Sequence, residues 1–291
     1  MVTVIISSTQ DPASTNIKQG LLSESDWKET AVFFDAPVYE HQQLSDLYLV
    51  TIKDKTIIHE HLVEQLHDEL NINTTQAIFI SRHRSKTGRP SLTTHPIGNF
   101  GDALFGGRKR TLSPSLPHLM TEVLRSIHWN ATKKNLKHQV CFEVTHHGPY
   151  MSIPALFVEV GSNQQEWEKP FPASIVAQSL METIVKYRNR QDKYNETPVV
   201  IGIGGGHYAP RFTDVALVKN VSFGHMIPSY HIDNDSIDDE ILEQTIEMTP
   251  LCQGVYIHRK ALKKSQVSFF KQWCQDHDIR VFSSNDFITR S

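Results

Sequence analysis

The sequence predicts an α/β fold in which helices cover both faces of a mostly parallel sheet. Strand-like and helix-like segments alternate along most of the 291 residues. Strand candidates such as 154–160 are apolar almost without a break, which is typical of strands buried on both faces. A chain of this length is compatible with one large domain or two smaller ones, and we expect a single domain over residues 1–291.

The first third of the chain begins with a strand and a helix. Residues 2–7 form a short, β-branched run, and Asp11 and Pro12 then supply an N-cap and a first-turn proline for a helix that runs toward Leu22. Apolar runs at 31–34, 47–52 and 77–80 predict three more strands. Between the last two, apolar residues recur at every fourth position and predict a helix over 56–70.

A polar excursion at about 81–115 follows, rich in glycine, proline and threonine and without clear periodicity, so we expect a long loop there. Residues 81–110, here named the basic arm, carry one acid, Asp102, and the cations Arg82, Arg84, Lys86, Arg89, Arg108, Lys109 and Arg110. His95, Asn99 and Phe100 are interleaved with these charges. The arm suits the phosphates and unpaired bases of a nucleic acid, and a solvated loop explains it equally well.

The rest of the chain continues the alternation. An amphipathic helix begins at Ser115-Leu116-Pro117. Further strands are expected at 139–145, 154–160, 198–203, 254–257 and 279–282, and further helices at 172–187, 236–248 and 266–274. The segment 187–197 is polar and reads as a variable loop. Residues 233–247 carry seven acids and no lysine or arginine, so we expect that face to repel phosphates.

Composition excludes several classes of protein. The net charge of −3 argues against nonspecific binding of polyanions by the whole surface. Cys141, Cys252 and Cys274 show no CxxC spacing, so a disulfide scaffold and a cysteine zinc ribbon are not expected. The first residues lack the cationic start of a signal peptide, and no apolar run approaches the ~20 residues of a membrane span. We therefore expect a cytoplasmic protein.

Polar side chains suited to catalysis or binding are concentrated in the segment 201–214, which begins within the strand 198–203 and continues into the loop after it. Four glycines there precede His207, Tyr208, Arg211 and Asp214, and glycine lets a backbone approach a ligand closely. A dinucleotide fingerprint is not supported, because His207 occupies the third glycine position and Pro210 interrupts the helix that should follow. Tyr208, Arg211 and Asp214 are candidate substrate contacts. A sharp turn with a local ion pair between Arg211 and Asp214 is the structural alternative.

Histidine and glutamate recur at strand ends. His146 and His147 follow the strand 139–145, Glu159 ends the strand 154–160, His207 follows the strand 198–203, and His225 lies in a Phe-Gly-His-Met run. If these strands are neighbours, the side chains converge at one edge of the sheet. Three such ligands with one position left for water are the usual plan of a catalytic zinc site, which makes hydroxide at neutral pH and suits hydrolysis.

The same residues are also compatible with a mechanism that needs no metal. One histidine would then act as general base, with loop N–H groups as an oxyanion site. Each histidine taken alone is more often structural than a ligand. No serine lies in a GxSxG elbow, so a covalent acyl-enzyme has no support. Lys260, at another strand end, can neutralise a phosphate or simply be solvated.

Six ordered blocks together resemble the archaeal and plant type of D-aminoacyl-tRNA deacylase. The blocks are Ser81-Arg82-His83, His95-Pro96-Ile97-Gly98-Asn99-Phe100, Thr145-His146-His147-Gly148-Pro149, Phe157-Val158-Glu159-Val160-Gly161-Ser162 with Glu166-Trp167, the run 204–214, and Phe223-Gly224-His225-Met226-Ile227-Pro228. They recur in that order from about Ile80 onward, and the strand–helix opening is compatible with the family. The resemblance therefore covers most of the chain.

The resemblance implies a hydrolase that cleaves the ester between a D-amino acid and the terminal ribose of tRNA. It implies broad side-chain tolerance, a role in translation quality control, a Zn²⁺ cofactor, and a three-layer α/β/α fold with a mixed sheet, similar to the phosphorylase/peptidyl-tRNA hydrolase group. The partner would be the acceptor end of aminoacylated tRNA, and we expect a monomer. A zinc amidase or peptidase, and a non-enzymatic tRNA-binding protein, are the alternatives.

The site residues expected on these grounds fall into four sets. The catalytic residues are His207, His225, Glu159 and His147. The metal ligands are His146, Glu159 and His207, and the substrate contacts are Tyr208, Arg211, Asp214, His95 and Asn99. The tRNA contacts are Arg82, Arg84, Lys86, Arg108, Lys109, Arg110 and Lys260.

Overall fold

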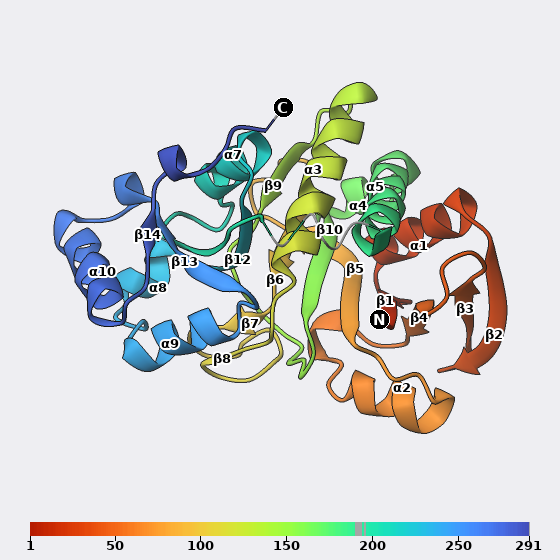
Figure 1. Cartoon of the computed structure of the whole chain (residues 1–291). Helices are drawn as coiled ribbons and strands as arrows, with labels where there is room; N and C mark the ends of the chain where they lie inside the picture. Colours follow the sequence, from red (N-terminus) through yellow and green to blue (C-terminus); the bar gives the residue numbers. More distant parts are fainter. Residues whose placement is uncertain (190–193, 195, 291) are drawn as a thin grey trace.

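The computed structural model describes residues 1–189, 194 and 196–290, which form two large sheets and one two-stranded sheet, with helices around the large ones (Figure 1). The predicted α/β class is confirmed. The loop expected over 187–197 lies partly outside the described residues, and α5 (Pro170–Asn189) takes its first positions. Among the described residues, no helix is both long and apolar enough to cross a bilayer.

The main sheet is mixed and has the order β2-β3-β4-β1-β5-β10-β6-β9. Its strands are β1 (Thr3–Ser8), β2 (Trp27–Phe33), β3 (Ala36–His41), β4 (Leu47–Ile52), β5 (Gln76–Arg84), β6 (Ser91–Pro96), β9 (Gln139–Phe142) and β10 (Ala155–Ser162). The four strands β4, β1, β5 and β10 run parallel, whereas β6 runs antiparallel to β10. β6 then pairs in parallel with β9.

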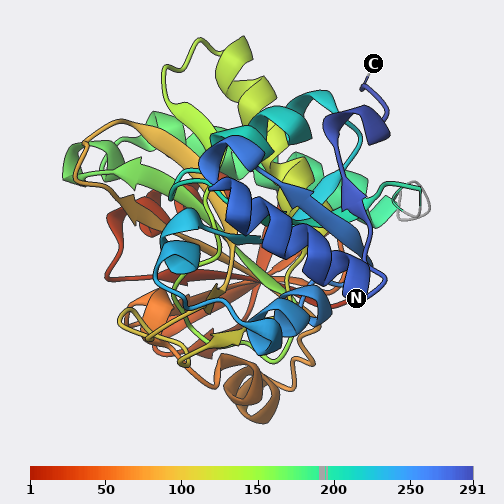
Figure 2. The same ribbon diagram turned by 90° about the vertical axis from the view of Figure 1, so that its left-hand side faces the viewer.

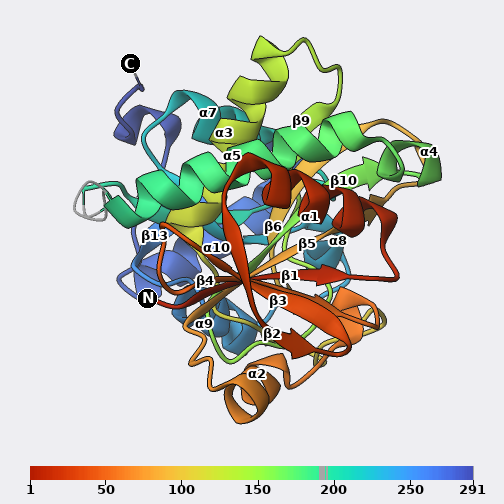
Figure 3. The same ribbon diagram turned by 90° about the vertical axis from the view of Figure 1, so that its right-hand side faces the viewer.

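Helices cover both faces of the main sheet, as the apolar strands predict. One face packs against α1 (Pro12–Glu24), α3 (Pro117–Lys133) and α5, burying residues such as Ile78 and Val158. The other packs against α2 (Leu62–Leu70) and buries Phe79 and Phe157. Figure 3 shows α1 and α5 on one side of this sheet and α2 on the other.

The second sheet is parallel and has the order β12-β11-β13-β14. Its strands are β11 (Val199–Ile203), β12 (Ser222–Ile227), β13 (Cys252–Ile257) and β14 (Val281–Phe282). α8 (Ser229–Asp233), α9 (Asp239–Glu247) and α10 (Lys264–Asp276) belong to this half, and Figure 2 shows α10 crossing in front of the sheet. The prediction of neighbouring strands required β11, which precedes His207, to share a sheet with β10, which carries Glu159. The two strands lie in different sheets, so that part of the prediction is wrong.

Several local predictions can be compared directly. Asp11 caps α1 as expected, since its carboxylate accepts from the Ser14 and Arg82 backbone N–H groups at 3.0 and 2.8 Å. The single helix expected over 56–70 is wrong, because left-handed backbone at His61 (φ 62°) separates a 3₁₀ turn from α2. Pro210 does not interrupt a helix but begins α7 (Pro210–Val218), where its missing N–H costs no hydrogen bond.

The long loop expected over 81–115 is also wrong in large part. β5 continues to Arg84, and residues 91–96 form β6, which is buried throughout between β10 and β9. Serine, threonine and histidine give β6 no apolar pattern, although threonine favours strands because it is β-branched. The short strands β7 (Gly98–Asn99) and β8 (Thr111–Leu112) bracket the irregular remainder.

Candidate active site

The two sheets meet where a cluster of histidines and carboxylates gathers. Two isolated β-bridges join the segments there, one between Ile97 and His146 and one between Glu143 and Tyr208. The cluster draws on both sheets and on the loop after β9. Its members are His83 on β5, His95 on β6, Glu143, His146 and His147 after β9, Glu159 on β10, and His207 and Tyr208 after β11.

Strand alternation explains why side chains of the main sheet share this cluster. In the register of the sheet Ser81 lies opposite Glu159, and Thr93 lies opposite Glu159 on its other side. His83 and His95 are two residues further along their strands and so project on the same face. Gly161 leaves the room that His83 needs, because a Cβ there would lie 3.1 Å from the His83 ring and 2.4 Å from Ser91 Oγ.

Two carboxylates are buried in the cluster. Glu159 is 2% exposed and accepts from Ser81 Oγ at 2.5 Å, while Glu143 is fully buried. The Glu143 oxygens lie 3.0 Å from His83 Nδ1 and 2.9 Å from His207 Nε2. Both oxygens thus face imidazole nitrogens, and no other donor reaches them among the described residues. A buried carboxylate in that position attracts a cation.

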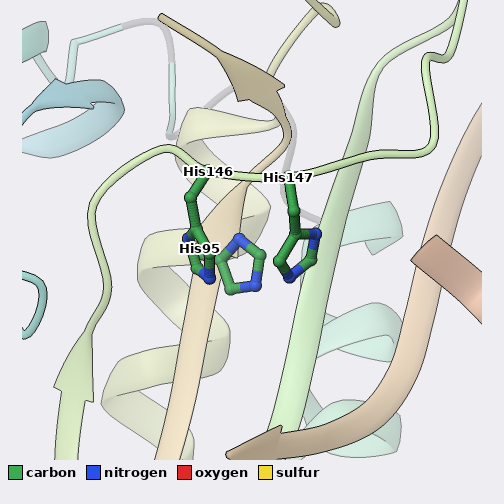
Figure 4. Close-up of side chains that lie close together, drawn as sticks. All are labelled: His95, His146 and His147. Carbon is green, nitrogen blue, oxygen red and sulfur yellow. The ribbon is translucent and has the colours of Figure 1, made fainter. Parts of the chain in front are cut away.

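Three histidines of the cluster each hold Nδ1 on a backbone carbonyl, which leaves Nε2 as the nitrogen that faces the other two rings. Nδ1 of His95, His146 and His147 lies 3.0, 2.8 and 2.9 Å from the backbone carbonyls of residues 96, 144 and 148. Because a carbonyl only accepts, each Nδ1 carries a proton, and each ring in its neutral form keeps a lone pair on Nε2. Figure 4 shows the three rings side by side, with centroids 4.1 to 4.8 Å apart.

The electrostatics of the cluster separate two groups of histidines. Burial disfavours charge on His83 and His95, but the two buried carboxylates outweigh it, so they raise the pKa of His83 to about 11 and that of His95 above its usual value. Burial and the nearby charge of His95 lower the pKa of His147 to about 4 and push the pKa of His146 well below its usual value. His146 and His147 are therefore neutral at pH 7, and the neutral imidazole is the form that binds metals.

His207 and Tyr208 form the open side of the cluster. The His207 side chain is 38% exposed, and its Nε2 faces Glu143, so Nδ1 is the nitrogen left for solvent. The Tyr208 hydroxyl lies 3.0 Å from His83 Nε2. Tyr208 also lines a hollow of about 530 Å³ with Gly205, Gly206 and Tyr230. The hollow therefore borders the cluster at Tyr208.

Three groups of side chains bring their ligand atoms within 4.8 Å of one another among the described residues. They are His95 with His146 and His147, His83 with Glu143 and His207, and His95 with Glu143 and Glu159. The predicted set of His146, Glu159 and His207 is not one of them. Within the first group, buried His95 Nε2 has no hydrogen-bond partner in the described chain, so a cation fits this set of donors.

Other predicted site residues lie outside the cluster. His225 is within β12 and fully buried, with Thr145 Oγ1 3.0 Å from Nδ1 and the Ser113 carbonyl 2.9 Å from Nε2, so its predicted convergence with the site is wrong. Asn99 donates to the Gly106 and Arg108 carbonyls and shapes its own loop. Arg211 and Asp214 do not pair, since Arg211 bonds Tyr256 and exposed Asp214 lines a separate hollow.

The basic arm contacts the acidic segment 233–247. Arg110 binds both Asp238 carboxylate oxygens, at 2.8 and 2.7 Å, and Lys109 pairs with Asp102 at 2.7 Å. Arg82 and Arg84 lie over the Trp167 ring, and Arg108 lies over Tyr150. Lys86 and Lys260 are exposed. Part of the arm's charge is therefore neutralised within the chain.

Sequence reasoning missed two members of the cluster, Glu143 and His83. Glu143 interrupts an apolar run, Cys141-Phe142-Glu143-Val144, and an acid buried in such a run needs a cationic partner. That signal could have identified it. His83 is three residues beyond the end predicted for its strand, so its position on the same face as Ser81 was hidden.

The fold and the cluster together define a class of protein. Buried histidines and carboxylates at the meeting point of strand ends in an α/β fold are typical of a metal-binding or acid–base site. The sequence profile described as D-aminoacyl-tRNA deacylase matches residues 70–282. The chain belongs to the D-aminoacyl-tRNA deacylase family, a family of enzymes.

Individual relatives cover nearly the whole chain. The D-aminoacyl-tRNA deacylase of Pyrococcus abyssi is 33% identical over 275 residues, which are 94% of this chain and 96% of that protein. That of Methanosarcina mazei is 32% identical over 286 residues, covering 97% and 92%. A crystal structure of a conserved protein of unknown function is 28% identical, with a TM-score of 0.87, covering 100% of this chain and 98% of that one.

Proposed function

We propose that this chain hydrolyses the ester between a D-amino acid and the terminal ribose of tRNA, releasing the free D-amino acid and tRNA. Membership of the deacylase family supports the substrate class. The cluster at the junction of the sheets supports hydrolysis, since it combines buried carboxylates, neutral imidazoles and an open side. The observation that carries the proposal is the shared orientation of His95, His146 and His147, each with Nδ1 held by a backbone carbonyl.

These three histidines would hold Zn²⁺, in place of the set His146, Glu159 and His207 expected from the sequence. Carbonyl bonds to Nδ1 fix the ring orientation and tautomer, which is the usual support for a metal-binding histidine. When bound, zinc lowers the pKa of water toward ~7 and polarises a carbonyl oxygen. His95 would give up the proton on Nε2, and Glu159, 3.7 Å from that nitrogen, would supply negative charge nearby.

His207 would take the proton of the attacking water. Its side chain is 38% exposed and Glu143 lies at Nε2, which leaves Nδ1 for the water. A carboxylate behind an imidazole holds the ring in place and stabilises its protonated form. The Tyr208 hydroxyl lies beside His83, which is protonated, and would donate a proton to the leaving ribose oxygen.

Broad side-chain specificity is supported by the shape of the open side. The hollow beside Tyr208 presents Gly205 and Gly206, and an added Cβ at Gly206 would meet nothing within 4 Å. A wall made of glycine backbone leaves space for side chains of different sizes. Tyr230, 40% exposed over the same hollow, offers a ring for stacking the terminal base.

The test is release of the same amino acid from its D- and L-aminoacyl-tRNA by the purified chain and by His207→Ala. We expect fast release of the D form, slow release of the L form, and loss of D release in the variant. The matched control is His128→Ala, which changes an exposed histidine on α3. Equal release of the two forms, or full D release by His207→Ala, would count against the proposal.

A further inference from the structure

A second hollow of about 1310 Å³ adjoins the one beside Tyr208. His258 lines both, so the two lie side by side near the end of β13. The second hollow, here named the C-terminal groove, lies between the end of the second sheet and α10. Its lining includes five cations, Arg211, Arg259, Lys260, Lys264 and Lys271. The groove thus lies beside the hollow at Tyr208 and extends along α10.

The C-terminal groove is strongly basic. No Asp or Glu is among its lining residues, and within the described ranges none of its five Lys and Arg side chains has a carboxylate oxygen within 4.0 Å. Lys109 and Arg110 of the basic arm, by contrast, are held by Asp102 and Asp238. Cations that share a hollow without a nearby carboxylate create a field that attracts anions.

One cation of the groove, Arg211, is held in place by neutral partners. Arg211 donates from Nε and a terminal nitrogen to the Tyr256 hydroxyl at 3.0 and 2.7 Å, and to Ser284 Oγ at 2.7 Å. Both partners are neutral, so the guanidinium keeps its charge for a ligand. Lys264 and Lys271 are seven residues apart on α10, so they share one helix face and lie about 10 Å apart along the axis. A row of cations at this spacing suits an extended polyanion better than a single phosphate.

We infer that the C-terminal groove binds the phosphodiester backbone of tRNA next to its 3′ end. This inference rests on the proposed function, because the scissile ester is on the terminal ribose and the preceding phosphates must leave the site by an adjoining path. The groove adjoins the hollow beside Tyr208, with His258 lining both, and its row of lysines matches such a path. Binding there relies on charge and is independent of sequence.

The experiment compares the chain with the double variant Lys264→Ala/Lys271→Ala, and with Lys28→Ala/Lys55→Ala, which removes two exposed lysines that do not line the groove. Three quantities are measured: affinity for uncharged tRNA across a range of salt concentrations, kcat/KM for D-aminoacyl-tRNA, and kcat/KM for the D-aminoacyl ester of adenosine. The ester lacks every phosphodiester, so it reports the site without the groove.

We expect the groove variant to bind tRNA at least about tenfold more weakly, with a salt dependence shallower by about two, because each lost phosphate contact lowers that slope by about one. Its kcat/KM should fall on D-aminoacyl-tRNA and stay unchanged on the adenosine ester. Binding and kinetics equal to those of the control variant would overturn the inference, as would an equal loss on both substrates. If the unmodified chain releases neither substrate while the groove variant still loses tRNA affinity, the proposed function fails and the groove stands.

Discussion

His147 is half-buried in the loop after β9, whereas His225 is fully buried nearby, and their hydrogen bonds differ in one respect. His147 places Nδ1 on its neighbour's carbonyl and keeps Nε2 free within the cluster. Both ring nitrogens of His225 form hydrogen bonds within the protein, one with the Thr145 hydroxyl and one with the Ser113 carbonyl. Burial lowers the pKa of each to about 4, so both are neutral. A free ring nitrogen, and not neutrality, distinguishes the histidine available for chemistry from the structural one.

The comparison predicts the largest effect for His147→Ala. Loss of one imidazole from the three that face one another should lower kcat/KM by about 10³-fold or more, because metal chemistry supplies several kcal/mol of transition-state stabilisation. The free energy of unfolding should change little more than for an average substitution. Steady-state kinetics with D-aminoacyl-tRNA and urea titrations measure the two quantities, and an active His147→Ala would break the comparison.

His225→Ala should show the opposite balance. The substitution leaves a cavity in a fully buried position and removes the partners of Thr145 and Ser113, so we expect a loss of about 3 kcal/mol in the free energy of unfolding. At a temperature where the variant is folded, kcat/KM should stay within about tenfold of the original. A loss of up to that size is expected because His225 contacts Thr145, which precedes His146 in the chain. Normal stability with lost activity would place His225 in the chemistry after all.

A smaller effect is expected from pH, at His118. This buried histidine on α3 lies with Nδ1 2.9 Å from Ser222 Oγ, and burial lowers its pKa to about 4 from the usual 6.5. Between these values the unfolded chain binds more protons, so stability is full above pH 6.5 and falls as pH drops toward 4. The shift corresponds to at most about 3 kcal/mol. His118→Gln should flatten that part of the urea-unfolding pH profile, and an unchanged slope would show that His118 is not the group that titrates.

Much of the fold was predictable because its strands are apolar and its helices periodic. The strand 47–52 and the cap at Asp11 are local features, and both are confirmed. β6 was not predictable in the same way, since its buried residues are mostly serine, threonine and histidine. The division into two sheets was also hidden, because it depends on strand pairing between distant segments, which periodicity does not encode.

The site was predictable in composition but not in grouping. His146, His147, Glu159 and His207 do gather, because strand ends and the loops after them meet at one place. Which of them face one another depends on side-chain orientation, and that is decided by backbone carbonyls such as those of residues 144 and 148. His225 shows the limit of spacing arguments, since a position inside β12 turned it toward Ser113 instead.

The most direct test of the central claim is D-specific release before chelation, after chelation, and after zinc is added back, with bound zinc measured at each stage. We predict that the chain loses activity and zinc together and regains both, and that His147→Ala neither retains zinc nor responds to it. His225→Ala serves as the control and should behave like the original chain. Release that is indifferent to the chelator would contradict a metal held by His95, His146 and His147, and would leave His207 and Glu143 as the catalytic pair.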